Sequence, residues 1–120
     1  MNKANEIGRK VEAIALHFLA CKKHHILEKN WRWQKAEIDI ISQDKKTLVF
    51  VEVKTRSTER YWQPKEFVSL RKEALMKEAA EAYLEINELE LELRFDIISI
   101  VLKNGTSKIE HLENVFWEVI

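Results

Sequence analysis

The sequence predicts an α/β fold in which helices flank a mixed β-sheet, and three patterns lead to this prediction. Segments 4–23 and 66–86 carry apolar residues at the three- and four-residue spacing of amphipathic helices. Short runs rich in β-branched residues lie between and after them, which predicts the order α, β, β, β, α, β, β. No repeat, low-complexity segment or linker interrupts this order, so a single domain is expected over residues 1–120.

The two predicted helices each carry a charged residue near the apolar face. Glu12 lies at the margin of the first apolar stripe, where an acidic side chain either points toward the sheet or reaches water. Lys72 lies on the second helix, where its ammonium group either reaches a charged face of the sheet or stays in solvent. Both alternatives remain open from the sequence.

A β-hairpin is predicted over residues 36–56, with a polar turn at 42–46. Strand side chains alternate between the two faces of a sheet, so each strand of this hairpin has a polar and an apolar face. The polar faces carry Glu37 and Asp39 on the first strand, and Glu52, Lys54 and Arg56 on the second. The apolar faces carry Ile38 and Ile40, and Val49, Val51 and Val53.

If the two strands pair, the carboxylates of Asp39 and Glu52 face each other across about 5 Å. At an effective dielectric near 20, two like charges at that distance repel by roughly 3 kcal/mol. Lys54 and Arg56 offset part of this repulsion, and a divalent cation would offset the rest because hard metals bind carboxylate oxygens. The alternative is that these charges form the solvated face of an antiparallel sheet.

The remaining segments complete the sheet. Residues 26–33 predict a strand beside the hairpin, and 94–102 and 109–112 predict two more, joined by a turn at Asn104-Gly105. Segment 87–93 either ends the second helix or opens the next strand. Tyr61 and Trp62 in loop 57–65 either fold back on the core, which is the favoured interpretation, or are contact residues. The apolar tail 114–120 is expected to pack on the core.

Composition limits the class of function. The chain has 20 basic and 20 acidic residues, so nucleic-acid binding would need a local patch or a metal that cancels acidic groups. Two glycines exclude a P-loop and a dinucleotide-binding motif. A single cysteine, Cys21, indicates a reducing compartment, and no apolar run is long enough for a signal peptide or a membrane span. A cytoplasmic protein without a membrane partner is therefore expected.

The hairpin and its flanking segments resemble a known family. Asp39 followed by Glu52-Val53-Lys54 is similar to the D…E-x-K core of the PD-(D/E)XK nuclease superfamily. More closely, the chain resembles the YraN-like family of uncharacterised, endonuclease-like bacterial proteins. The matching residues are Gly8, Glu12, Asn30-Trp31-Arg32, Glu37-Ile38-Asp39, Phe50 to Arg56, Lys72, Arg94-Phe95-Asp96, His111, Asn114 and Phe116.

The resemblance implies a restriction-endonuclease-like domain, similar to Holliday-junction resolvases, with a Mg²⁺ or Mn²⁺ site. It implies that Asp39, Glu52 and the Val53 carbonyl hold the metal. In this comparison Glu12 assists the site, and Lys54 orients or deprotonates the attacking water and stabilises charge on the phosphate. Nucleic-acid contacts are implied for Arg56, Arg32 and Lys72.

Two functions are therefore expected as alternatives. The first is metal-dependent hydrolysis of DNA phosphodiester bonds, on branched or damaged DNA. The second is a non-catalytic module of the same fold that binds nucleic acid or a protein partner. A homodimer that uses the apolar tail around Phe116 and Trp117 is compatible with either.

Overall fold

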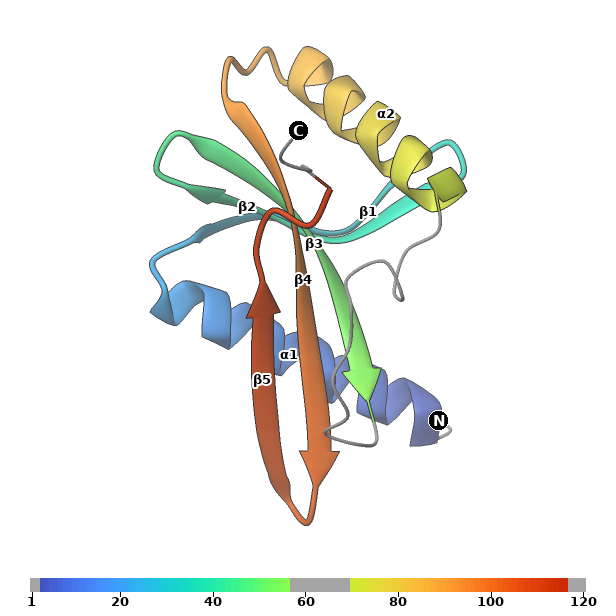
Figure 1. Ribbon diagram of the computed structural model, residues 1–120, viewed down its shortest axis with the longest axis vertical. Coiled ribbons are helices and arrows are strands. Elements are labelled where there is room, and N and C mark those ends of the chain that lie inside the picture. The colour runs from blue at the N-terminus through green and yellow to red at the C-terminus, as the bar shows by residue number, and fades with distance from the viewer. Residues whose placement is uncertain (1–2, 57–69, 117–120) are drawn as a thin grey trace.

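The computed structural model describes residues 3–56 and 70–116, and its elements follow the predicted order (Figure 1). The elements are α1 (Lys3–Cys21), β1 (His25–Trp33), β2 (Ala36–Asp44), β3 (Thr47–Arg56), α2 (Leu70–Ile86), β4 (Glu92–Lys103) and β5 (Thr106–Leu112). The predicted loop 57–65, the predicted first turn of the second helix and Trp117 lie outside the described residues. Of the two alternatives for segment 87–93, the structure has the one in which it opens a strand, since α2 ends before it at Ile86 and β4 begins within it at Glu92.

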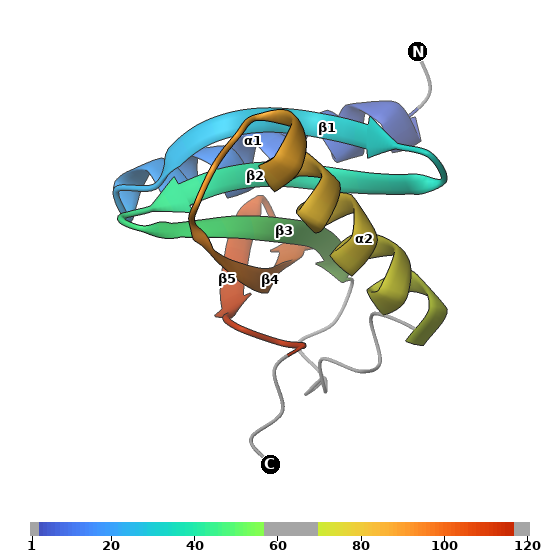
Figure 2. The same ribbon diagram turned by 90° about the horizontal axis from the view of Figure 1, so that it is seen from above.

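The five strands form one mixed sheet in the order β1-β2-β3-β4-β5. All neighbouring pairs are antiparallel except β3 and β4, which are parallel because α2 connects them as a crossover. The helices cover opposite faces, as the view from above shows (Figure 2). The predicted α/β architecture, a mixed sheet flanked by helices, is confirmed and is consistent with a nuclease-like fold. Neither described helix has the length and apolar character needed to cross a bilayer.

Each face of the sheet has its own hydrophobic core. The α2 face is built on Phe50, Phe95 and Tyr83, and the ring of Phe50 contacts the rings of the other two. The α1 face buries aliphatic side chains, namely Val11, Ala15, Leu19, Ile40, Val49, Val51, Ile98 and Ile100. The apolar stripe of α1 and the alternation of β3 thus pack as the sequence predicts.

The prediction that Ile38 and Ile40 lie on the same apolar face of β2 is wrong. Ile38 packs in the α2 core, whereas Ile40 packs in the α1 core. Two residues apart on a regular strand would share a face, so β2 is irregular between them. Its neighbour β1 is irregular at the same level, where Asn30 has a left-handed backbone (φ +50°). A register shift lies further along β1, at Leu27 opposite Ile41 and Ser42.

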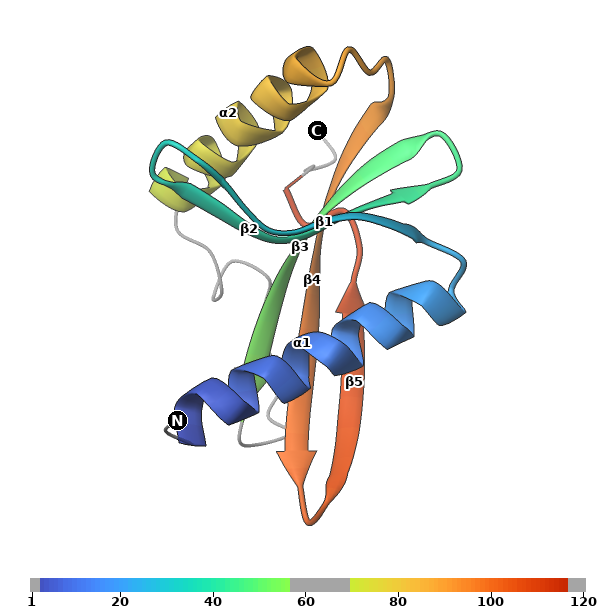
Figure 3. The same ribbon diagram turned by 180° about the vertical axis from the view of Figure 1, so that it is seen from behind.

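The sheet forks at the same level. The β2–β3 ladder ends at Ile40 and Val51, although β2 goes on pairing with β1 and β3 goes on pairing with β4 as far as Arg56. In Figures 1 and 3, β1 and β2 swing toward the start of α2 while β3 and β4 run away from it. The fork leaves main-chain groups of β2 and β3 without strand partners on its inner sides.

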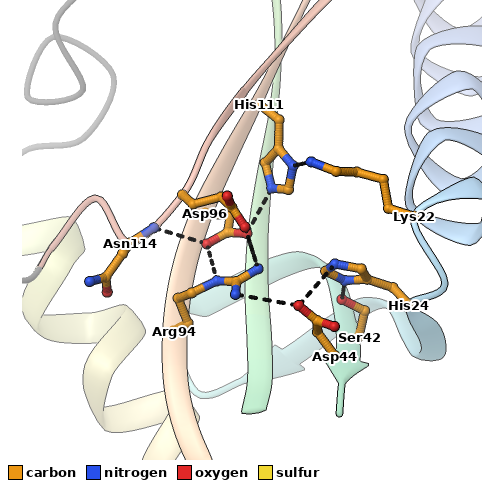
Figure 4. A network of polar contacts seen from close by, with 9 residues as sticks. Lys22, His24, Ser42, Asp44, Arg94, Asp96, His111 and Asn114 are labelled. Atoms are coloured by element: carbon orange, nitrogen blue, oxygen red, sulfur yellow. Dashed lines mark hydrogen bonds and ion pairs between the residues drawn. The ribbon is translucent and has the colours of Figure 1, made fainter.

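A polar network stabilises the end of the sheet that lies away from the fork (Figure 4). The fully buried carboxylate of Asp96 accepts hydrogen bonds from Arg94 Nε and Nη2 (both 3.0 Å), His111 Nε2 (2.7 Å) and the Asn114 amide (3.0 Å). Arg94 also contacts Asp44 at 3.5 Å, and thereby connects β4 to the end of β2. Burial by itself raises the pKa of the Asp96 carboxyl, but these hydrogen bonds outweigh it and hold the pKa below its usual value.

The network also defines the tautomer of His111. The Lys22 ammonium lies 2.8 Å from His111 Nδ1 and can only donate, so Nδ1 accepts and Nε2 carries the hydrogen that is donated to Asp96. Lys22 directly follows α1, so the end of that helix is held against β5.

We predict that Asp96→Asn lowers the free energy of unfolding at pH 7 by about 3 kcal/mol, because it removes one partner of a buried ion pair. A carboxyl with a lowered pKa contributes stability above its unfolded pKa of about 3.9, and loses it as the pH falls through the folded value. The difference between wild type and variant should therefore shrink below pH 4. Urea denaturation across pH measures it, with Glu92→Gln, an exposed acid of the same strand, as the control. Equal stability of wild type and Asp96→Asn at pH 7 would contradict this.

Candidate functional site

The candidate site lies where the β2–β3 ladder ends. Asp39 would be the next residue of β2 to pair with β3, but the ladder stops before it, and its side-chain Oδ2 accepts a hydrogen bond from the Val53 amide at 2.8 Å. The N–H and C=O of one strand residue point to the same neighbouring strand. The Val53 carbonyl therefore also points into the fork.

Asp39 and Glu52 line the same cavity, of about 340 Å³, and so lie on the same side of the sheet. They do not form the predicted cross-strand pair, because the ladder stops one residue before it would bring them together. The walls of this cavity are Lys35, Ala36, Glu37, Asp39, Glu52, Lys72, Leu75 and Met76. The site therefore joins the fork of the sheet to the first turns of α2.

Glu52 is buried and its carboxylate is shared by two lysines. Lys72 Nζ, from α2, lies 2.7 Å from Glu52 Oε1, and Lys54 Nζ lies 3.3 Å from the same oxygen. Of the two alternatives for Lys72, the structure has the one in which its ammonium reaches the charged face. Two cations at one carboxylate oxygen offset much of the cost of burying its charge.

Asp39 is the acid whose charge the fold disfavours. Burial raises the pKa of the Asp39 carboxyl to about 6, and the nearby charge of Glu52 adds to the effect. The hydrogen bond from Val53 and the charge of Lys72 act in the opposite direction and are too weak to cancel it. A group that titrates near neutral pH in a cleft is characteristic of a functional site, and a bound cation would favour its ionised form.

Glu12 lies on the other side of Asp39. It lines a second, smaller cavity of about 140 Å³ together with Gly8, Val11, Asp39, Val53 and Thr55. Its carboxylate accepts from the Asn30 side-chain amide, at 3.1 Å to Oε1 and 3.4 Å to Oε2. Glu12 therefore does point toward the sheet, but Glu12, Asp39, Glu52 and Lys54 do not meet in one cavity. Asp39 is the residue common to both cavities.

The two arginines expected to contact nucleic acid, Arg32 and Arg56, differ in their exposure to solvent. Arg32 is exposed and its Nη2 lies 3.3 Å from Oε2 of Glu37, a residue of the larger cavity's wall. Arg56 is buried, and its Nη2 lies 3.4 Å from Glu110 Oε2. Arg32 is therefore available at the rim, while Arg56 is held within the protein.

The donor set at the fork fits a hard divalent cation. Asp39 and Glu52 supply carboxylate oxygens and Val53 a carbonyl, which are the ligand types of Mg²⁺ and Mn²⁺. A second group of possible metal ligands among the described residues is Asp96, His111 and Glu113, whose ligand atoms lie within 4.8 Å of one another. Arg94 donates hydrogen bonds to Asp96 and forms an ion pair with Glu113 at 3.0 Å, so a guanidinium already supplies positive charge to that group.

Two features of the site are not predicted by the sequence patterns. Asn30 is indicated only by the resemblance, yet its side chain bonds to Glu12 and so links β1 to α1, and its backbone is left-handed. Asparagine tolerates that backbone region better than most residues, which is a usable signal. Met76 and Leu75 line the cavity from α2, and no pattern distinguishes them from ordinary core residues.

Comparison with known proteins gives consistent matches along the chain. The sequence model of the uncharacterised protein family UPF0102 matches residues 11–100. A UPF0102 protein of Christiangramia forsetii is 43% identical over 117 residues, covering 98% of each chain. One from Flavobacterium psychrophilum is 44% identical with the same coverage. One from Bacteroides thetaiotaomicron is 37% identical over 98% of this chain and 97% of its own.

We predict that Asp39→Asn stabilises the protein at pH 7 by roughly 2 kcal/mol, because it removes a carboxylate that the fold disfavours. The folded wild type keeps this proton up to about pH 6, whereas the unfolded chain releases it near pH 3.9. Wild-type stability should therefore fall as the pH rises from 4 to 6, relative to the variant. Chemical denaturation at pH 4, 5, 6 and 7 measures the difference, with Glu90→Gln, an exposed acid, as the control. A pH-independent difference would contradict the assigned pKa.

Proposed function

The chain belongs to the uncharacterised protein family UPF0102, and from this membership and the geometry of the fork we propose that it is a metal-dependent endonuclease acting on DNA. The observation that carries the proposal is the grouping of Asp39 and Glu52 on one cavity, with two lysines in contact with Glu52. Folding alone does not require two acids to share a cavity, since their mutual repulsion and burial are unfavourable.

The proposed metal is Mg²⁺ or Mn²⁺, held by Asp39, Glu52 and the Val53 carbonyl, with Glu12 on the adjoining cavity. When bound, such an ion supplies Lewis-acid activation of the phosphate and lowers the pKa of a bound water. A divalent cation between the two carboxylates would favour their ionised forms and offset their mutual repulsion, which supports this assignment.

The lysines have distinct proposed roles. Lys54 follows Glu52 on the same face of β3, so its ammonium can orient the attacking water and stabilise negative charge on the phosphate. Lys72 reaches Glu52 from the wall formed by α2, where it can contact a phosphate entering the cavity. Arg32 at the rim adds a further phosphate contact.

The proposed substrate is DNA with branched or damaged structure, and the proposed location is the cytoplasm. The net charge of zero means that binding depends on the few cations around the fork rather than on the field of the whole protein. The single cysteine, Cys21, is a free thiol, as expected in a reducing compartment.

A second candidate is a non-catalytic module that binds nucleic acid through the same surface. One observation favours it, namely that Lys72 and Lys54 already neutralise Glu52 without a metal. In that case the lysines serve the fold and the binding of phosphate, and cleavage would not occur.

We predict that Mn²⁺ binds the wild type, and that Asp39→Asn and Glu52→Gln each weaken binding at least tenfold, because each removes one anionic ligand. Glu90→Gln, which removes an equal charge at a distant exposed position, should leave the affinity unchanged. Calorimetric titration measures the affinities. Because Asp39 must be ionised to bind the metal, the affinity should rise as the pH increases through 6. Equal binding by all four proteins would remove the site.

We predict that the wild type with Mg²⁺ or Mn²⁺ cleaves at least one substrate in a panel of linear, nicked and branched DNA. Lys54→Ala should reduce cleavage by 100-fold or more while DNA binding stays within about threefold, because the role of Lys54 lies in the transition state. Quantified gels and fluorescence anisotropy measure the two effects. Absence of cleavage by a wild type that binds metal and DNA would favour the non-catalytic module instead.

A further inference from the structure

The sheet has two edges, and only one of them is regular in the part of the chain that the structure describes. On β1, the register shift at Leu27 and the left-handed Asn30 interrupt the row of main-chain groups, which is a common way to prevent pairing at an edge. On β5, pairing with β4 continues without a shift from Thr106 to Leu112. The edge formed by β5 can therefore accept another strand.

The turn at Asn104-Gly105 defines which groups of β5 face outward. Both turn residues have positive φ (+51° and +75°), as in a two-residue hairpin, so Lys103 and Thr106 form the first hydrogen-bonded pair. Hydrogen-bonded and non-hydrogen-bonded pairs then alternate along the strand. The residues whose N–H and C=O point away from β4 are Ser107, Ile109 and His111.

We propose that this edge binds a second copy of the chain, with β5 pairing antiparallel to the partner's β5 about a two-fold axis at Ile109. In this register the outward groups of Ile109 bond to those of the partner's Ile109, and Ser107 bonds to the partner's His111. Lys108 then lies directly opposite the partner's Glu110, and Glu110 opposite the partner's Lys108. Both residues are exposed, so the strand is complementary in charge to itself. Glu110 also lies 3.4 Å from Arg56 of its own chain, so in the dimer its carboxylate is shared between Arg56 and the partner's Lys108.

A lysine on an edge strand normally discourages pairing with other strands. In the antiparallel register about Ile109 this effect is offset, because an acid lies opposite each of the two copies of Lys108. The occupant that this edge fits is therefore the same strand of another copy.

An apolar groove beside β5 favours the same partner. Residues of α1 and β5 line a cavity of about 520 Å³, and they are Lys10, Ala13, Ile14, His17, Phe18, Cys21, Ser107 and Ile109. In Figures 1 and 3, α1 crosses β5 and its C-terminal end extends beyond this edge of the sheet. A two-fold axis normal to the sheet at Ile109 keeps both copies of α1 on one face, where each can cover the other's groove.

The position of Phe116 supports β5 rather than the C-terminal tail as the interface. Its ring lies 5.0 Å from that of Phe95, between centroids, and it packs on the α2 core of its own chain. The predicted dimer surface around Phe116 is thus already engaged, and Trp117 lies outside the described residues.

Sedimentation equilibrium of the wild type, Lys108→Glu and Lys103→Glu tests the proposal. The wild type should dimerise, and Lys108→Glu should raise the dimer dissociation constant about tenfold or more, since it turns two attractive cross-strand pairs into repulsive ones. Lys103→Glu makes the same charge change on β4 beside the turn and should leave the constant unchanged. A wild type that stays monomeric at millimolar concentration, or equal constants for all three, would overturn the β5 interface.

Cysteine cross-linking tests the register without depending on the folding of Lys108→Glu. In a Cys21→Ser background, Ile109→Cys should form a covalent dimer under mild oxidation, because the Cα atoms of a hydrogen-bonded pair lie about 5.5 Å apart, within disulfide range. Thr106→Cys, three residues from the axis, should remain monomeric. Equal cross-linking at the two positions, or none at Ile109→Cys, would overturn the proposed register.

Discussion

The early end of the β2–β3 ladder is the constraint on which the candidate site depends. Up to Ile40 and Val51, main-chain hydrogen bonds hold the two strands together, and beyond that point each strand follows its other neighbour. A buried amide without a partner is costly, and the Asp39 carboxylate supplies the missing acceptor for Val53. The fork therefore depends on Asp39 to satisfy the Val53 amide, and Asp39 can do so only because the strands separate there. The cavity lies where β2 and β3 diverge.

Asp96 and Asp39 show that the same type of side chain has different roles in different surroundings. Asp96 receives hydrogen bonds from Arg94, His111 and the Asn114 amide, and its pKa is lowered, which indicates a structural role at the joint of three strands and α1. Asp39 accepts a hydrogen bond from the Val53 amide beside another acid, and burial raises its pKa to about 6. The acid that the fold leaves poorly compensated is the one that a cation would stabilise.

Much of the fold could be predicted because its signals are local. The spacing of apolar residues predicted α1, the alternation on β3 predicted its two faces, and Asn104-Gly105 predicted the last hairpin. The polar turn of the first hairpin is shorter than expected, since β2 continues to Asp44 and only Lys45 and Lys46 lie between the strands. Polar residues at the end of a strand are compatible with either state, because solvent satisfies both.

Residue type and spacing along the chain were enough to predict the order of the elements, the acids and lysine on the hairpin, and the family to which they point. How the acids meet depends on the three-dimensional packing. A period of two assigns faces only while a strand stays regular, and the irregularity between Ile38 and Ile40 changes the face in mid-strand. Likewise, Lys72 reaches Glu52 and Glu12 reaches a separate cavity because each helix packs on its own face of the sheet. Packing between distant segments, which local pattern does not encode, is the physical reason for that division.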